Sequence, residues 1–237
     1  MNFEFTEEQQ MLRESLARFL REKYDFETRQ KIIASDDGWS RETWAQFAEM
    51  GLMAAAFPEE YDGFGGTAVD LSVIMEEFGR GLVIEPYLPT VVLAGGVLRH
   101  TGGEQAKELI AQISAGEIVM GLGFAEPRSR YDLFHVETKA EKQGDDYVLS
   151  GHKAVVLAAN IADKLIIAAR TSGNIRDEDG ISLFLVDKNT DGLTVEGYPT
   201  IDGLQAGDVI LEQVKVPAAS LVGEEGKAYP VLEAVID

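Results

Sequence analysis

The spacing of apolar residues changes near residue 117, and this change limits the possible folds more than any other feature of the sequence. Before it, apolar residues recur every three or four positions, as at Leu12, Leu16 and Leu20, after a capping-box pattern that starts at Thr6. After it, short β-type runs alternate with turn signals such as Gly144–Asp146. Because no helical pattern separates these runs, they favour an antiparallel β-barrel over a parallel α/β sheet. The sequence predicts an α+β fold with helices first and a barrel-like sheet second.

The chain has three predicted segments, of which the first two meet at this change. We expect an α-helical N-terminal domain at residues 1–117 and a β-barrel middle domain at residues 118–226. Residues 227–237 have the pattern of a starting helix, and no Gly or polar C-cap ends it. We therefore expect the chain to be the front part of a longer polypeptide, in which further helices follow.

The chain is strongly acidic. It has 237 residues, with 21 Lys and Arg against 41 Asp and Glu, and a formal net charge of −20. A field of this sign repels nucleic acid and anionic lipid surfaces, so we expect neither as a partner. A phosphate-bearing ligand would need a local basic cluster, for which Arg128, Arg130 and Lys153 are the candidates. The alternatives for these three residues are plain surface charge and occlusion of a site.

Several kinds of site find no support in the residues. There is no Cys, which excludes disulfides and thiolate chemistry. The three His residues lie far apart without carboxylates at ligand spacing, so we expect no metal site. Gly121–Gly123 lacks the third glycine of a dinucleotide fingerprint. The acidic N-terminus and the lack of a long apolar run predict a cytoplasmic protein without a membrane span.

Five short motifs, taken in their order along the chain, carry a resemblance to a known family. They are Pro58–Gly66, Gly123–Pro127, Gly151–Lys153, Val214–Pro217 and Leu221–Gly226. Together they resemble the N-terminal and middle domains of the acyl-CoA dehydrogenases, most closely the small-subunit type of heteromeric bacterial enzymes of fatty acid or sterol side-chain breakdown. The resemblance implies FAD as cofactor, an acyl-CoA substrate and electron-transfer flavoprotein as electron acceptor. It also implies a homo-oligomer, or a hetero-oligomer with a second acyl-CoA dehydrogenase subunit, and a C-terminal helical bundle that is absent from this chain.

The resemblance extends to individual site residues. It places along the flavin Leu122, Phe124, Ala125, Tyr131, Val155, Val156 and Leu157, and near the CoA substrate Tyr131 and Arg130. In the family the position of Ala125 usually holds Thr or Ser, and Val155–Leu157 stands where the family has Trp-Ile-Thr. Tyr131 takes the place of a serine that touches CoA. Three polar or aromatic flavin contacts are therefore replaced by apolar side chains, although Val155–Leu157 is also typical of a buried strand.

These replacements leave two main functions open. The first is FAD-dependent α,β-dehydrogenation of an acyl-CoA thioester, with electrons passed to electron-transfer flavoprotein. The alternative is a non-catalytic or weakly flavin-binding partner subunit of a heteromeric acyl-CoA dehydrogenase, and a third is a flavin-dependent monooxygenase or oxidase. No Glu matches the catalytic base of the family, and Glu126 is a structural residue of its motif. We therefore expect no catalytic residue in this chain and no activity from it in this truncated form.

Overall fold

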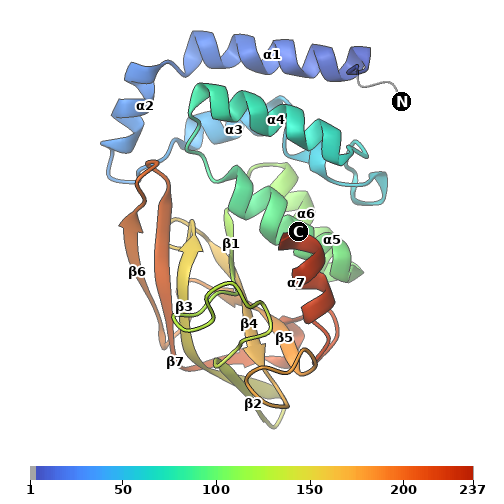
Figure 1. The fold of residues 1–237 in the computed structure, drawn as a ribbon, viewed down its shortest axis with the longest axis vertical. Coiled ribbons are helices and arrows are strands. Elements are labelled where there is room, and N and C mark those ends of the chain that lie inside the picture. The colour runs from blue at the N-terminus through green and yellow to red at the C-terminus, as the bar shows by residue number, and fades with distance from the viewer. Residues whose placement is uncertain (1–3, 237) are drawn as a thin grey trace. The chain divides into compact units, whose positions relative to one another are not determined.

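The computed structural model describes residues 4–236, which divide into two compact units (Figure 1). The first unit holds the chain up to Glu85 together with Ser114–Gly116, and the second holds Pro86–Ile113 and the chain from Glu117 onward. The helical segment 86–113 thus packs with the sheet, although it precedes the predicted boundary near residue 117. Residues 1–3 of the predicted first domain and Asp237 at the end of the predicted third segment lie outside the described residues.

Helices make up the first unit. They are α1 (Glu7–Lys23), α2 (Phe26–Ile33), α3 (Arg41–Glu49), short 3-10 turns at Ala54–Ala56 and Glu59–Tyr61, and α4 (Ala68–Gly81). The predicted capping box of α1 is confirmed, because Gln9 N donates to Thr6 Oγ1 over 3.2 Å and Thr6 N donates to Gln9 Oε1 over 3.0 Å. Helix α1 packs on α4 and buries Leu16 and Leu20.

Local signals also set the ends of α3. Ser40 caps its start and accepts from Thr43 N over 3.1 Å, as its place before an apolar face predicts. The helix buries Trp44 and Phe47, whose aromatic rings add apolar area to the core of this unit. The chain then turns at Gly51, which has a φ of 74° that a residue with a Cβ would adopt only with strain.

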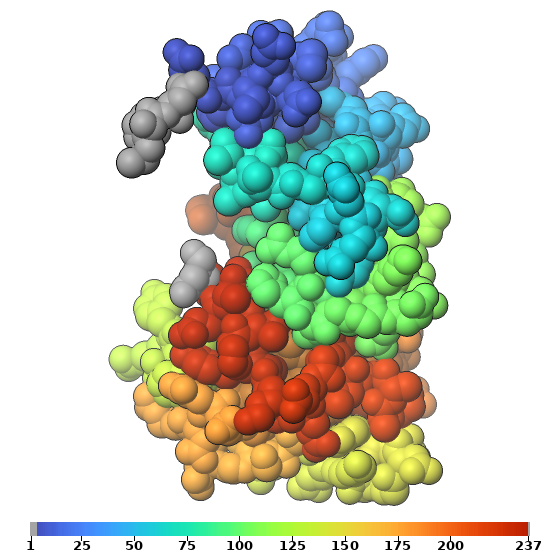
Figure 2. Space-filling view, turned by 90° about the vertical axis from the view of Figure 1, so that its right-hand side faces the viewer, coloured from blue at the N-terminus to red at the C-terminus, as the bar shows by residue number. Residues whose placement is uncertain are grey.

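Most helical segments of the second unit precede or follow its strands along the chain, and one short turn lies between the last two strands. These segments are a π-helix at Leu88–Ala94, α5 (Gly95–Thr101), α6 (Gly103–Ser114), a 3-10 turn at Ala218–Ser220 and α7 (Tyr229–Ile236). Figure 2 shows α7, in red, against the green helical segment that contains α5. This packing is close, since a Cβ on Gly96 would lie 3.3 Å from Val235. None of the helices within residues 4–236 is long and apolar enough to cross a membrane.

The second unit is built around one mixed sheet. Its strands are β1 (Met120–Gly123), β2 (Lys139–Gln143), β3 (Asp146–Leu157), β4 (Lys164–Arg170), β5 (Ile181–Asp187), β6 (Leu193–Pro199), β7 (Gln205–Pro217) and β8 (Leu221–Val222). They lie in the order β6-β7-β3-β2-β4-β5-β8, with β1 beside β4. The pairing is antiparallel except for β1 with β4 and for one parallel residue pair between β2 and β4. The prediction of a helical part followed by a sheet is confirmed.

The π-helix is tied to the first strand by one side chain. Thr90 is fully buried, and its Oγ1 donates to Met120 O over 3.0 Å and accepts from Met120 N over 3.1 Å. A single hydroxyl thereby satisfies both backbone groups of Met120 on the side away from β4. This contact sets the start of β1, from which the candidate site begins.

Candidate functional site

The segment after β1 and the middle of β3 lie side by side in the second unit. Ala154 N donates to Ala125 O over 2.9 Å, which joins the two backbones. Gly123 permits the close approach, because a Cβ there would lie 2.8 Å from Ile167 and 3.5 Å from Val156. The two segments predicted to face a flavin are therefore neighbours in the structure.

The predicted residues in these segments face in two directions. Leu122 and Val156 are 3% and 2% exposed, so they pack in the core and support the site. Val155 points outward and is 58% exposed. Phe124, Ala125 and Leu157 are half-buried. We refer to the four predicted residues of these segments that are not fully buried together as the outer surface: Phe124, Ala125, Val155 and Leu157.

Val155 adopts a backbone conformation that β-branched residues rarely take. Its φ is 53°, in the left-handed region where its Cβ branches crowd the backbone. The pairing of β3 with β7 shifts register between Lys153 and Val156, so Val155 lies in a β-bulge. Such a bulge turns a side chain away from the regular alternation of a strand, and here it turns Val155 to the outer surface.

A polar cluster on β3, β6 and β7 lies beside Val155. Asp208 Oδ1 accepts from Val155 N over 3.2 Å and from Tyr198 Oη over 2.8 Å. Asp208 Oδ2 lies 2.8 Å from His152 Nε2. Partial burial alone would raise the pKa of Asp208, but the Tyr198 hydroxyl, the Val155 N–H and His152 together hold this pKa below its ordinary value.

Sequence reasoning did not find Asp208 or Tyr198. The sequence does not predict a strand at β6, because Gly197 and Pro199 interrupt the apolar alternation of these residues. Without β6, nothing in the sequence places Tyr198 opposite the end of β7. A usable signal was the lone Asp208 inside the apolar run of β7, since a charged residue there needs a partner.

The predicted basic cluster does not exist as a unit. Arg128 and Arg130 are exposed, but the Lys153 side chain is 0% exposed and its Nζ lies 2.7 Å from Glu126 Oε1. Lys153 therefore cannot meet a phosphate from solvent, and that part of the prediction is wrong. The physical reason is that its strand position faces the core, where an ammonium group requires a carboxylate partner.

Glu126 joins three parts of the second unit. Besides Lys153 it accepts from Glu137 N over 2.6 Å and from Thr138 N over 3.0 Å. Burial alone would raise the pKa of Glu126, but the Lys153 ammonium and these donors hold it below its ordinary value. Burial lowers the pKa of Lys153, and Glu126 opposes that shift. The pair thus fixes the loop between β1 and β2 over β3.

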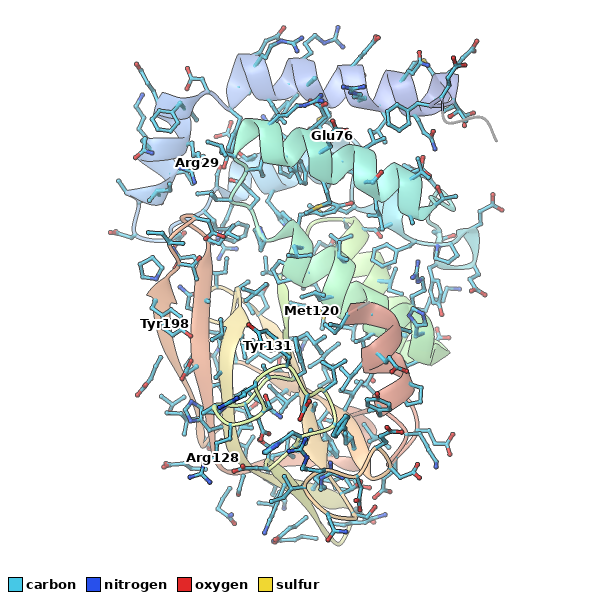
Figure 3. All side chains as sticks on the ribbon, in the orientation of Figure 1. Arg29, Glu76, Met120, Arg128, Tyr131 and Tyr198 are labelled. Carbon is cyan, nitrogen blue, oxygen red and sulfur yellow. The ribbon has the colours of Figure 1, made fainter. Side chains whose placement is uncertain are left out.

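This loop carries the residues that were predicted to meet the substrate. Tyr131 is fully exposed, and Arg130 takes a φ of 53° beside it. Figure 3 labels Arg128 and Tyr131 in the loop. Further along, the buried Arg170 holds the loop through Phe134 O, to which its Nη2 donates over 3.0 Å. That Arg130 and Tyr131 contact a CoA ester stays a prediction.

The outer surface offers apolar contact area and little polar chemistry. Its four side chains are hydrocarbon, so a flavin ring placed on them would find no side-chain donor or acceptor for its polar edge. The neighbouring polar groups, Asp208, Tyr198 and His152, already bond with one another. These residues do not fit a flavin held through side-chain hydrogen bonds. Within residues 4–236 no group of three or more His, Asp and Glu side chains could hold a metal ion.

Comparison with known domain families matches both parts of the chain. Residues 6–117 match the family described as acyl-CoA dehydrogenase, N-terminal domain. Residues 121–214 match the family described as acyl-CoA dehydrogenase, middle domain. The two matches follow one another along the chain and together cover most of it.

Individual relatives agree with these matches. The probable acyl-CoA dehydrogenase YngJ of Bacillus subtilis is 32% identical over 235 residues, which cover 97% of this chain and 61% of that protein. The crystal structure of the ChsE4-ChsE5 complex from Mycobacterium tuberculosis contains a chain with a TM-score of 0.87 and 28% identity, covering 100% of this chain and 61% of that one.

A further similar chain occurs in the structure of the electron transferring flavoprotein of Acidaminococcus fermentans, with a TM-score of 0.85 and 27% identity. That match covers 98% of this chain and 62% of that one. The chain therefore spans less than two thirds of the length of the relatives that it matches.

Proposed function

The chain belongs to the acyl-CoA dehydrogenase family, and from this premise we propose that it is a subunit, or the front part of one, in an assembly that carries out FAD-dependent α,β-dehydrogenation of an acyl-CoA thioester. The succession of both domain families supports the reaction class. The neighbouring positions of the two segments that the resemblance assigns to the flavin support it as well.

Within that assembly we propose that this chain is a weakly flavin-binding or non-catalytic partner subunit rather than the main holder of FAD. One observation carries this choice: the outer surface presents hydrocarbon side chains only, at Phe124, Ala125, Val155 and Leu157. Each polar group of the flavin that is buried without a partner weakens binding by about 1–3 kcal/mol. Two such losses reduce the affinity roughly a hundredfold.

The proposed partners follow from the same premise. A second acyl-CoA dehydrogenase subunit would hold the flavin, and an electron-transfer flavoprotein would accept the electrons. The similarity to a chain of the ChsE4-ChsE5 complex supports a hetero-oligomer, and the similarity to a chain in an electron transferring flavoprotein structure supports the electron acceptor. The substrate class, an acyl-CoA, rests on the family alone.

The visible spectrum of the purified protein tests this proposal. We expect the full chain to be colourless alone and to copurify as a yellow complex when it is coexpressed with a second acyl-CoA dehydrogenase subunit. Restoring the polar and aromatic residues of the family, with Ala125→Thr, Val155→Trp and Leu157→Thr together, should raise flavin retention by the isolated chain. Val195→Thr on β6 adds a hydroxyl elsewhere in the sheet unit and should leave retention unchanged. A stoichiometric flavin band from the isolated wild-type chain would contradict the partner-subunit role.

A further inference from the structure

The bulge that exposes Val155 is held in place against a conformational penalty. A β-branched residue in the left-handed region is strained and persists only where neighbouring contacts determine it. Three contacts do so here. Ala154 N bonds to Ala125 O, the Val156 side chain is buried beside Gly123, and Val155 N bonds to Asp208.

The bulge could form without backbone strain if residue 155 were a glycine. Glycine would adopt a φ of 53° without strain. Valine adds a side chain that is 58% exposed, so it contributes little to the core. The penalty is therefore associated with presenting an apolar side chain on the outer surface at this point of β3.

Asp208 is the contact that acts on Val155 itself, and its own position is fixed from two sides. Tyr198 reaches it from β6 and His152 from β3, so three groups converge on one carboxylate. Asp208 is only partly exposed, with 26% of its side chain accessible. A carboxylate held by three groups has few alternative rotamers, which makes it a fixed acceptor for the Val155 N–H.

We propose that Asp208 is a positioning residue: it holds Val155 in the left-handed conformation and thereby sets the shape of the outer surface, while Tyr198 and His152 hold Asp208. The proposal rests on the proposed function only in assigning that surface a role toward the flavin-bearing assembly. The contact between Asp208 and Val155 is independent of any cofactor.

Amide NMR of the full chain tests the proposal directly. In Asp208→Ala the Val155 amide proton should move upfield and exchange with solvent about fivefold faster, because it loses one hydrogen bond. Asp208→Asn keeps an acceptor oxygen and should stay within about twofold of the wild type. Glu196→Ala, which removes an exposed carboxylate directly across the strand pair from Asp208, is the matched control. It should leave the Val155 and Leu157 resonances in place.

A test in the Val155→Gly variant distinguishes a positioning role of Asp208 from a general loss of stability. In Val155→Gly the left-handed conformation carries no strain, so adding Asp208→Ala should shift the Leu157 resonance much less than it does beside valine. Tyr198→Phe removes one bond to Asp208 and leaves Val155 N its acceptor. Tyr198→Phe should shift the Val155 resonance in the same direction as Asp208→Ala but by less. It replaces Asp208→Ala in the test if that variant does not fold.

Three results would overturn the proposal. They are unchanged Val155 resonances in Asp208→Ala, equal changes in Glu196→Ala, and an Asp208→Ala effect of the same size in the Val155→Gly background. Flavin is not part of this readout. A chain that retains no flavin alone or with the second subunit would contradict the proposed function and leave the positioning role of Asp208 standing.

Discussion

Lys153 Nζ lies 2.7 Å from Glu126 Oε1, and both side chains are almost completely buried, at 0% and 3% exposed. This ion pair joins β3 to the start of the loop between β1 and β2. Because Glu126 also accepts two backbone N–H groups, its charge is satisfied only when β3, the loop and the start of β2 are all in place.

Removing the cation of this pair should strongly destabilise the second unit. Lys153→Met leaves a buried carboxylate without its partner, and we expect the free energy of unfolding to fall by about 3–5 kcal/mol in urea titrations. Adding Glu126→Gln to Lys153→Met should recover part of the loss. Lys164→Met, which breaks a partly exposed pair with Asp187, should cost less than about 1 kcal/mol. Equal losses for the two lysines would show that burial of the pair is unimportant.

Any larger residue at Gly123 should lower the stability of the second unit. A Cβ at this position would lie 2.8 Å from Ile167 and 3.3 Å from Lys153, both in the core of the sheet unit. We expect Gly123→Ala to lower the midpoint of urea unfolding, with a loss of about 1–3 kcal/mol from overpacking. Gly79→Ala is the matched control. Nothing lies within 4 Å of its new Cβ, and alanine in helix α4 should stabilise by up to about 1 kcal/mol.

The stability of the first unit should depend on pH through Glu85. This side chain is 4% exposed, and burial raises its pKa from 4.5 to about 7. A carboxyl with a raised folded-state pKa adds stability below pH 4.5, and this contribution is lost as the pH rises through 7. We expect Glu85→Gln to gain about 3 kcal/mol relative to the wild type between pH 4.5 and pH 8. Glu49→Gln, at an exposed site in the same unit, is the matched control. A pH-independent difference for Glu85→Gln would contradict the assignment.

Replacing Arg170 by lysine should destabilise the second unit. It is 7% exposed, and its guanidinium donates to carbonyl oxygens of Phe134, Val136, Ile175, Asp177 and Asp179. Lysine cannot reproduce this planar set of donors, so we expect Arg170→Lys to lose at least about 2 kcal/mol of unfolding free energy. Thermolysin should also cleave between residues 172 and 180 sooner than in the wild type. Arg176→Lys, at an exposed arginine paired with Asp132, should behave like the wild type in both measurements.

The elements that were predictable carry their signals within a few residues. The capping box of Thr6 and Gln9, the cap at Ser40 and the turn at Gly51 each depend on neighbours within a single turn. The hairpin at Gly144 is of the same kind, since β2 and β3 pair on either side of it. The residues of such short-range interactions are close in sequence, so local sequence patterns predict them.

The errors concern residues whose partners lie far along the chain. Lys153 is a wrong candidate for the basic cluster because the sequence shows its charge but not its burial in β3 beside Glu126, which lies 27 positions away. Strand β6 was missed because its polar and Gly residues suit an edge strand, which only its pairing with β7 reveals. Each error depends on how a strand pairs with a distant segment, and local propensity does not specify this pairing.

The sequence by itself determined that helices precede the sheet, because periodicity is a local property. The resemblance of its short motifs indicated the family and proposed the two segments of the candidate site. Only the tertiary structure decided which of those site residues are accessible. It turned Val155 outward in a left-handed bulge and buried Val156 beside it. The physical reason is that Asp208, 53 positions from Val155 in sequence, becomes its hydrogen-bond partner only when β3 and β7 pair in one register.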